Sequence, residues 1–227
     1  MPSKGKICNF DCIYCECGWN ADGRSDSGMP NAAQVRSLLE NRLCECMLNS
    51  EKIDSITFSG DGEPTLNPDF PRIVDDVIML RDAFVPSAKI SVLSNATTLD
   101  RPGVFDALCK VDNPIMKLDA VTAGMAQRIN RPYKGYDPAA VIESLQRFEG
   151  NFILQTMFLK CKDFDSSDPV VLNAWMDVVR FLKPREVMVY TIDRPTPMQG
   201  IEKFTEEQMS ELVRPLTDQG FKIQIKG

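Results

Sequence analysis

The run Cys8-Asn9-Phe10-Asp11-Cys12-Ile13-Tyr14-Cys15 decides how this sequence is interpreted. Three cysteines stand close together in it, and an aromatic residue precedes the last one. Three thiolates on one short loop can hold three irons of a [4Fe–4S] cluster, and the fourth iron is then left without a protein ligand. An open iron can bind a small molecule and pass an electron to it. We therefore predict that Cys8, Cys12 and Cys15 are metal ligands.

A structural zinc site is the alternative for the same cysteines. Zinc normally takes four Cys or His ligands, usually as two separated pairs. The chain has no histidine, and Cys17 as a fourth ligand would give an unusually tight spacing. The ligand set therefore favours the cluster.

Composition predicts one domain over residues 1–227, because 227 residues with 43% hydrophobic side chains suit a single full core. No apolar run approaches the length of a membrane span, and no secretory signal is visible. Metal-type cysteine spacing in a chain of this length favours a reducing cytoplasm over disulfides. The net charge of −6 argues against an RNA partner, which usually requires a basic surface.

Short β-branched runs alternate with helical patterns along the chain. Asn67-Pro68, Asp137-Pro138 and Asp168-Pro169 each combine an N-cap residue with a proline, which predicts helix starts. The strands are predicted at Ile53–Ser59, Lys89–Ser94, Ile115–Asp119, Phe152–Leu159, Glu186–Thr191 and, more weakly, Phe221–Ile225. The spacing of these strands is typical of βα repeats, which build a parallel sheet of the α/β class.

The glycine-rich turn Gly60-Asp61-Gly62-Glu63 follows the first predicted strand. Glycines allow the chain to turn sharply there, and the carboxyl ends of barrel strands carry active-site loops. Later strands end in polar residues. Ser94 and Asn95 could bind a ligand's hydroxyl or carboxylate groups, or could only shape a turn. Lys117 and Asp119 share one side of their strand, where they could contact a ligand or form a buried ion pair.

The cysteine run and the glycine turn together resemble the signatures of the radical S-adenosylmethionine (SAM) enzymes. The resemblance implies a [4Fe–4S] cluster whose open iron binds SAM, and reductive cleavage of SAM to a 5′-deoxyadenosyl radical that abstracts hydrogen from a substrate. It also implies that the turn holds the amino group of SAM. The cofactor-binding residues expected on this basis are Tyr14, Gly60, Asp61, Gly62, Glu63, Ser94, Asn95, Lys117, Asp119 and Gln155.

The resemblance implies a partial (β/α)6 barrel whose first strand precedes the cluster loop. Only seven residues precede Cys8, and Lys4-Gly5-Lys6 is a poor strand. Either that strand is degenerate, or native residues lie upstream of Met1; we expect the second. A gap should then lie beside the strand Ile53–Ser59.

Several sequence segments resemble the compact Fe–S oxidoreductases related to the catalytic domain of wybutosine-synthesising enzymes. These segments are Cys12–Cys15, Ser59–Pro68 and Tyr190–Arg194. Tyr190, Asp193 and Arg194 follow a late strand and are the expected substrate contacts, although Arg194 could equally lie in a surface loop.

We hypothesise a radical SAM enzyme with an unidentified small-molecule or peptide substrate and an electron donor such as flavodoxin or ferredoxin. The alternative from another class is a non-enzymatic Fe–S or zinc-binding protein. The glycine–glutamate turn favours the enzyme over the non-enzymatic protein, because an electron carrier needs no site for the methionine part of SAM. Among enzymes, a glycyl-radical activase is the rival, although the extra cysteines of a ferredoxin-like insertion are absent from the sequence.

Overall fold

The computed structural model describes residues 6–20 and 28–227. Six parallel strands form one sheet in the order β1-β2-β3-β4-β7-β9. These strands are β1 (Ser55–Phe58), β2 (Lys89–Ser94), β3 (Asn113–Lys117), β4 (Ile153–Met157), β7 (Glu186–Tyr190) and β9 (Ile223–Lys226). All five neighbouring pairs in that order follow chain order, as in an open βα barrel. The predicted α/β fold with a partial parallel barrel is confirmed.

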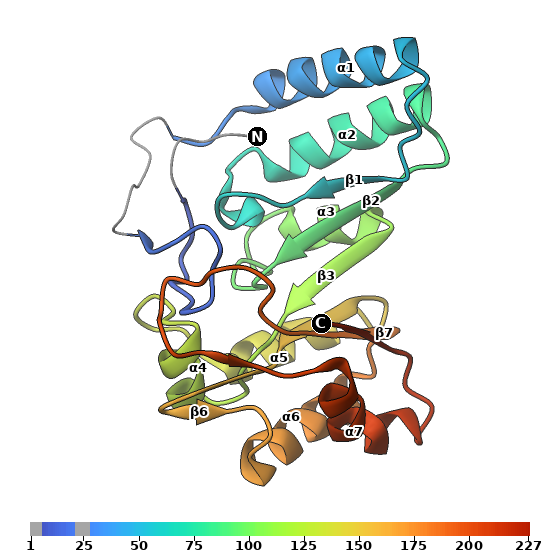
Figure 1. Ribbon diagram of the computed structural model, residues 1–227. Helices are drawn as coiled ribbons and strands as arrows, with labels where there is room; N and C mark the ends of the chain where they lie inside the picture. Colours follow the sequence, from blue (N-terminus) through green and yellow to red (C-terminus); the bar gives the residue numbers. More distant parts are fainter. Residues whose placement is uncertain (1–5, 21–27) are drawn as a thin grey trace.

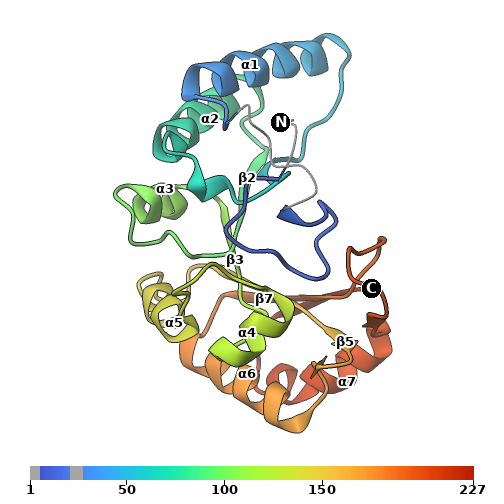
Figure 2. The same ribbon diagram turned by 90° about the vertical axis from the view of Figure 1, so that its left-hand side faces the viewer.

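Helices connect the strands, and most of them cover the outer face of the curved sheet (Figure 1). They are α1 (Ala32–Leu48), the short 3₁₀ helix η2 (Pro64–Leu66), α2 (Phe70–Phe84), α3 (Val104–Lys110), α4 (Ala123–Ile129), α5 (Pro138–Gln146), α6 (Pro169–Leu182) and α7 (Glu206–Thr217). In Figure 2, which looks onto the strand ends, helices α2, α3 and α5 lie on one side of the sheet and residues 6–20 on the other. No helix in the described part of the chain is both long and apolar enough to cross a membrane.

Two apolar clusters hold these layers together. The larger one packs the sheet against its helices, and Val74, Ile90 and Leu154 are completely buried in it. The smaller one includes Ile13 and Ile129 and packs residues 10–15 against α4 and a small antiparallel sheet. Burial of such side chains contributes about 1.5–3 kcal/mol each. The second cluster therefore fixes the cysteine run to the body of the protein.

The small antiparallel sheet was not predicted. It consists of β5 (Leu159–Cys161), β6 (Phe164–Asp165) and β8 (Glu202–Lys203) in the order β6-β5-β8. Two of these strands have two residues each, which is too short to show an alternating pattern. The predicted strand Phe152–Leu159 therefore proves to be β4 and the start of β5.

Several predicted boundaries were wrong by two residues, among them the starts of β1, β3 and β9. Helix α2 begins at Phe70 rather than at Pro68, because η2 intervenes and Asn67 ends that turn. Strand β3 ends at Lys117, so Asp119 lies beyond it. The helix starts at Asp137 and Asp168 are confirmed, since each carboxylate accepts backbone N–H bonds from the first turn.

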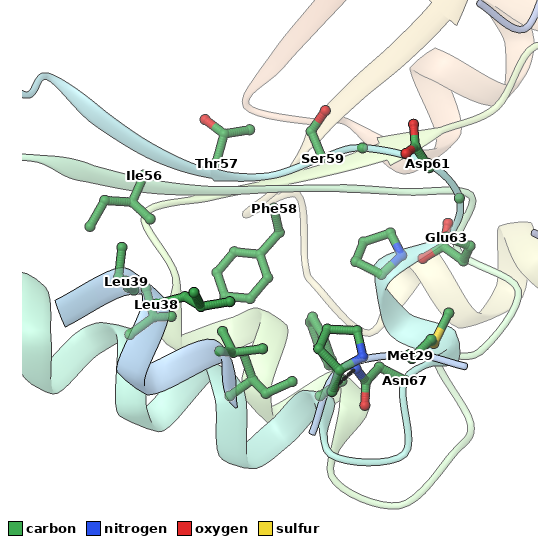
Figure 3. A pocket seen from close by; sticks show the side chains of 18 of the residues that line it. Met29, Leu38, Leu39, Ile56, Thr57, Phe58, Ser59, Asp61, Glu63 and Asn67 are labelled. Atoms are coloured by element: carbon green, nitrogen blue, oxygen red, sulfur yellow. Dashed lines mark hydrogen bonds between the residues drawn. The ribbon is translucent and has the colours of Figure 1, made fainter. Parts of the chain in front are cut away.

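The possible degenerate first strand at residues 4–6 lies mostly outside the described residues. Among the described residues no strand pairs with the outer edge of β1. An apolar cavity of about 380 Å³ lies there, between β1 and helices α1 and α2. Figure 3 shows Ile56 and Phe58 directed toward the helices on one face of β1, with Thr57 and Ser59 on the other. The side chains thus alternate as a strand requires.

Candidate active site

Residues 6–20, here called the cluster loop, lie at the carboxyl ends of the parallel strands (Figure 1). Two backbone hydrogen bonds fix its start to the glycine turn. The N–H of Ile7 donates to the carbonyl of Asp61 at 2.9 Å, and the N–H of Glu63 donates to the carbonyl of Ile7 at 2.9 Å. Gly62 stands opposite Ile7 with φ +142°, a conformation that favours glycine. The glycine turn therefore fixes the start of the cluster loop by backbone hydrogen bonds.

The second support of the cluster loop is the segment 129–133, which follows α4. The N–H of Asp11 donates to the carbonyl of Asn130 at 3.0 Å, and the N–H of Ile13 to that of Ile129 at 2.9 Å. In the other direction, the N–H of Tyr133 donates to the carbonyl of Asn9 at 2.9 Å. The loop is thus held by backbone bonds on both sides.

The three predicted ligands share this braced loop. Cys12 is buried, whereas Cys8 and Cys15 are partly exposed. The sulfur of Cys8 accepts the N–H of Phe10 at 3.4 Å, and the sulfur of Cys12 lies 3.5 Å from the side-chain nitrogen of Asn130. In the described part of the chain no three Cys, Asp or Glu side chains converge as ligands of a single ion. Three thiolates suit a [4Fe–4S] cluster, which takes one on each of three irons, whereas a structural zinc site normally takes four ligands.

Burial controls the protonation of these thiols. It raises the pKa of Cys8 to about 12 and also raises the pKa of Cys12. Iron binding must displace these protons, because thiolate is the form that binds metal. Cys17 lies 3.7 Å from both Gly60 O and Asp61 Oδ1 and belongs to the contact with the glycine turn.

The first residue of the cluster loop is a buried lysine. Lys6 is only 4% exposed, and its ammonium contacts Asp11 Oδ1 at 3.3 Å and the carbonyl of Gly18 at 3.1 Å. Burial alone would lower the pKa of Lys6, but the nearby negative charge of Cys15 and Cys8 outweighs it and raises the pKa. Lys6 therefore remains a cation beside the thiolates and joins the two ends of the loop.

Glu63 is buried and makes four hydrogen bonds within the protein. Its Oε1 accepts from Thr65 N at 3.0 Å, Thr65 Oγ1 at 2.5 Å and Ser94 Oγ at 2.9 Å, and its Oε2 accepts from Asn95 N at 2.7 Å. Burial raises the pKa of Glu63 despite these donors. The structure therefore directs the Glu63 carboxylate into the protein, where it joins the ends of β1 and β2.

Asn95 connects β2 to the cluster loop. Its side-chain nitrogen donates to Asn9 Oδ1 at 2.7 Å and lies 3.9 Å from the sulfur of Cys8. Asn9 in turn donates to Thr97 Oγ1 at 2.7 Å. Asn95 is thus close to the predicted ligand Cys8, and both Ser94 and Asn95 are hydrogen-bonded within the protein.

Asp119 is the centre of a polar group buried beneath the loop. Its Oδ1 accepts the N–H of Met157 at 2.8 Å, and its Oδ2 accepts the Tyr14 hydroxyl and the Asn130 amide, the latter at 2.7 Å. Lys117 Nζ lies 3.6 Å from Oδ1. Lys117 and Asp119 therefore lie on the same side of the chain, as the sequence predicts. Asp119 also binds Tyr14.

Lys117 lies between two aromatic rings. Its Nζ is 5.0 Å from the ring centre of Tyr14 and 4.9 Å from that of Tyr190, and it donates to the Tyr190 hydroxyl. Burial would lower the pKa of Lys117, but Asp119 outweighs it and keeps the pKa raised. Burial also raises the pKa of Tyr190 to about 12. A permanent cation therefore stands among the side chains predicted to face a ligand.

The remaining predicted residues lie around this group. Gln155 pairs with Lys117 in the β3–β4 register. Asp193 and Arg194 are exposed, and Arg194 Nη1 contacts Glu16 Oε2 at 2.8 Å. This ion pair spans from the cluster loop to the segment 193–197, beside a hollow of about 310 Å³ lined by Cys15, Trp19 and Pro195–Pro197.

Sequence reasoning missed three residues of the site, namely Lys6, Asn9 and Asn130. Asn9 lies inside the cysteine run and Lys6 just before it, so a charged or amide side chain next to the cysteines was the available signal. Asn130 follows a short helix, and only the packing of α4 against the loop brings it to Cys12. No sequence pattern used here could have indicated that contact.

The model of the Radical SAM superfamily matches residues 3–159. The chain therefore belongs to the Radical SAM superfamily, whose members are enzymes that use a [4Fe–4S] cluster and SAM. The predicted family and cofactors are confirmed, while the finer relation to wybutosine-synthesising enzymes stays a prediction.

The curated relatives include a UPF0026 protein of Synechocystis, 31% identical over 85% of this chain and 68% of that protein. Another is UPF0026 protein MJ1312 of Methanocaldococcus jannaschii, 29% identical over 84% of this chain and 57% of that protein. A protein of Brachyspira hyodysenteriae named GTPase Obg is 28% identical over 91% of this chain but only 29% of its own length. The chain thus spans only part of each of these relatives.

Solved structures share the fold at low sequence identity. Streptococcus suis SuiB bound to S-adenosylmethionine has a TM-score of 0.71 at 16% identity and covers 98% of this chain and 49% of that chain. A radical SAM methyltransferase from Sphaerobacter thermophilus has a TM-score of 0.72 at 15% identity, over 96% of this chain and 62% of that chain. These structures bear out the radical SAM fold.

Proposed function

We propose that this protein cleaves SAM reductively at a cluster held by Cys8, Cys12 and Cys15 and abstracts hydrogen from a small-molecule or peptide substrate. When bound, the cluster supplies one electron to SAM, which separates into methionine and a 5′-deoxyadenosyl radical. The observation that supports this most is the three-thiolate loop braced at the strand ends by the glycine turn and by segment 129–133.

The protein's own residues would orient SAM and exclude water. Gly60 and Asp61 are exposed next to the loop and offer a carbonyl and a carboxylate to the amino group of SAM. The Glu63 carboxylate would act on that group through the turn that it shapes, together with Ser94 and Asn95. Tyr14, Lys117, Asp119 and Gln155 would form the floor beneath the bound cofactor.

The hollow beside Cys15 is where we place substrate entry. It opens next to the predicted ligand Cys15, and Arg194 pairs with Glu16, which lines it. Asp193 and Arg194 directly precede its lining residues Pro195–Pro197 in the chain, whereas Tyr190 contacts Lys117 deeper in the protein. A peptide would suit such an open site, and a structure of SuiB bound to its precursor peptide SuiA shares the fold at 15% identity. We further propose a flavodoxin or ferredoxin as electron donor and the cytoplasm as location, in keeping with eight free cysteines.

The test is anaerobic reconstitution with iron and sulfide, followed by incubation with SAM and a strong reductant. We expect one cluster per chain and formation of 5′-deoxyadenosine and methionine in equal amounts. Changing Cys8, Cys12 or Cys15 to Ala should abolish both. Cys44→Ala is the matched control, because Cys44 is an exposed thiol on α1. Zinc without iron in the purified protein, or a cluster that never cleaves SAM, would contradict the proposal.

A further inference from the structure

Asn130 contacts a predicted ligand from outside the cluster loop. It lies directly after α4, is 3% exposed, and its Nδ2 is 3.5 Å from the sulfur of Cys12. An N–H···S contact of this length is a hydrogen bond, because sulfur is larger than oxygen. Cys12 is the most buried of the three ligands, so water is least able to replace this donor.

The neighbours of Asn130 fix which end of its amide faces Cys12. Asp119 accepts the Met157 N–H and the Tyr14 hydroxyl, and it lies 2.7 Å from the amide of Asn130. A carboxylate can only accept, so the amide must present its NH₂ group and not its oxygen. The same nitrogen lies 2.9 Å from the Tyr14 oxygen and 3.5 Å from Cys12 Sγ, so its second hydrogen faces these two acceptors together. A rotated amide would turn its oxygen to the carboxylate, which the charge forbids.

The backbone of Asn130 also supports the loop. Its carbonyl accepts the N–H of Asp11 at 3.0 Å, one residue before Cys12. The side chain and the main chain of one residue therefore act on adjacent positions of the loop. Because both groups of Asn130 contact the loop, the distance between its amide and the Cys12 sulfur is held more tightly than it would be for an exposed, mobile side chain.

We propose that Asn130 is a positioning residue that donates a hydrogen bond to the Cys12 thiolate and thereby raises the reduction potential of the cluster. Reduction adds negative charge to the iron and its sulfurs, and a hydrogen-bond donor stabilises the more negative state more strongly. Outer partners of this kind commonly change affinity or activity by at least tenfold. The inference rests on the cluster assigned under Proposed function.

The first experiment measures the reduction potential of the cluster by EPR-monitored titration in the wild type and in Asn130→Leu, which keeps the shape but has no donor. Loss of the bond should disfavour reduction roughly tenfold, which corresponds to about 59 mV for one electron. Asn113→Leu is the matched control, because Asn113 lies at the opposite end of β3 and bonds Ser91. It should leave the potential unchanged. An unchanged potential in Asn130→Leu would overturn the inference.

The second experiment needs no substitution at Asn130. It therefore tests the hydrogen bond to Cys12 even where Asn130→Leu fails to take up iron. Protein labelled with ¹⁵N in the asparagine side chains is reduced and studied by pulsed EPR. We expect a ¹⁵N coupling to the cluster spin that persists in Asn95→Ala, whose amide is the other one near a ligand sulfur. Absence of that coupling overturns the inference while leaving the proposed function intact. A wild type that forms no cluster contradicts the proposed function itself.

Discussion

The carbonyl oxygen of Ile7 lies where the side chain of residue 62 would begin. A Cβ added to Gly62 would be 2.0 Å from that oxygen, which is far inside van der Waals contact. The two backbones approach this closely because they exchange hydrogen bonds, and those bonds fix the start of the cluster loop. A glycine is therefore required at position 62 by the neighbouring chain as well as by its own backbone angle.

Gly62→Ala should release the cluster loop and greatly reduce the iron retained after reconstitution. Gly60→Ala is a matched control, because Gly60 has almost the same φ, +145°, but nothing lies within 4 Å of its added Cβ. Both variants bear the backbone strain, and only Gly62→Ala adds the clash. Iron and sulfide analysis after reconstitution measures the difference. Equal retention in the two variants would show that the close contact with Ile7 does not hold the loop.

Glu63→Ala should destabilise the protein, because it leaves buried donors of Thr65, Ser94 and Asn95 without an acceptor. Each unsatisfied group costs about 1–3 kcal/mol. Urea unfolding measures this effect, and a SAM titration of the reconstituted variant measures binding separately. We expect binding to weaken roughly tenfold or more as the turn loses its shape. Unchanged stability together with weaker SAM binding would instead indicate direct contact between the carboxylate and SAM.

Lys6→Met should lower the occupancy of the cluster while leaving the sheet intact. The substitution keeps the buried aliphatic chain but removes the cation that contacts Asp11 and Gly18 beside the three cysteines. Lys52→Met serves as the control, because Lys52 is largely exposed and pairs only with Asp54 among the described residues. Far-UV circular dichroism and the ratio of iron to protein give the two readouts. Full iron content in Lys6→Met would exclude a role for this charge in holding the loop.

Asp112 should make stability depend on acid pH at the far end of the sheet. Burial would raise its pKa, but the N–H of Ile90 and the cations Lys89 and Arg81 lower it to about 2. Because the folded-state pKa lies below the unfolded value of 3.8, the stabilisation is complete above that value and is lost as pH falls toward 2.

The gap in unfolding free energy between wild type and Asp112→Asn should therefore narrow by about 1–2 kcal/mol between about pH 5 and about pH 2. Urea unfolding over this range measures it. Asp75→Asn provides the comparison, because Asp75 forms an exposed pair with Lys110. A gap that stays constant with pH would contradict the lowered pKa.

The sequence was sufficient for the parallel sheet and the cluster loop because both depend on local patterns. Strand β2 was predicted at its observed bounds, since Ile90 and Val92 belong to a short apolar run with clear ends. The three cysteines could be predicted as ligands because this prediction depends only on their spacing. Strand β8 could not be predicted, because a two-residue strand forms only when β5 already lies beside it.

The orientation of the site side chains was harder to predict than their identity. The sequence placed Glu63 at the turn, but the direction of its carboxylate depends on Ser94 and Asn95, 31 and 32 residues later. The contact between Asn130 and Cys12 joins positions 118 residues apart. Such contacts follow from the packing of whole βα units, which a motif does not contain.

The distribution of the loop's supports along the chain has a consequence for folding. Residues 7–15 are synthesised before their partners, which lie at Gly62, at Asn95, in segment 129–133 and at Met198, after strands β1, β2, β3 and β7. Contacts so distant in sequence form late, because the intervening chain must first become ordered. The cysteines should therefore stay accessible until the segment after β7 is in place, and iron delivered to the nascent chain before that point would meet an unformed site. Cluster insertion in this protein is expected to be the last step of its maturation.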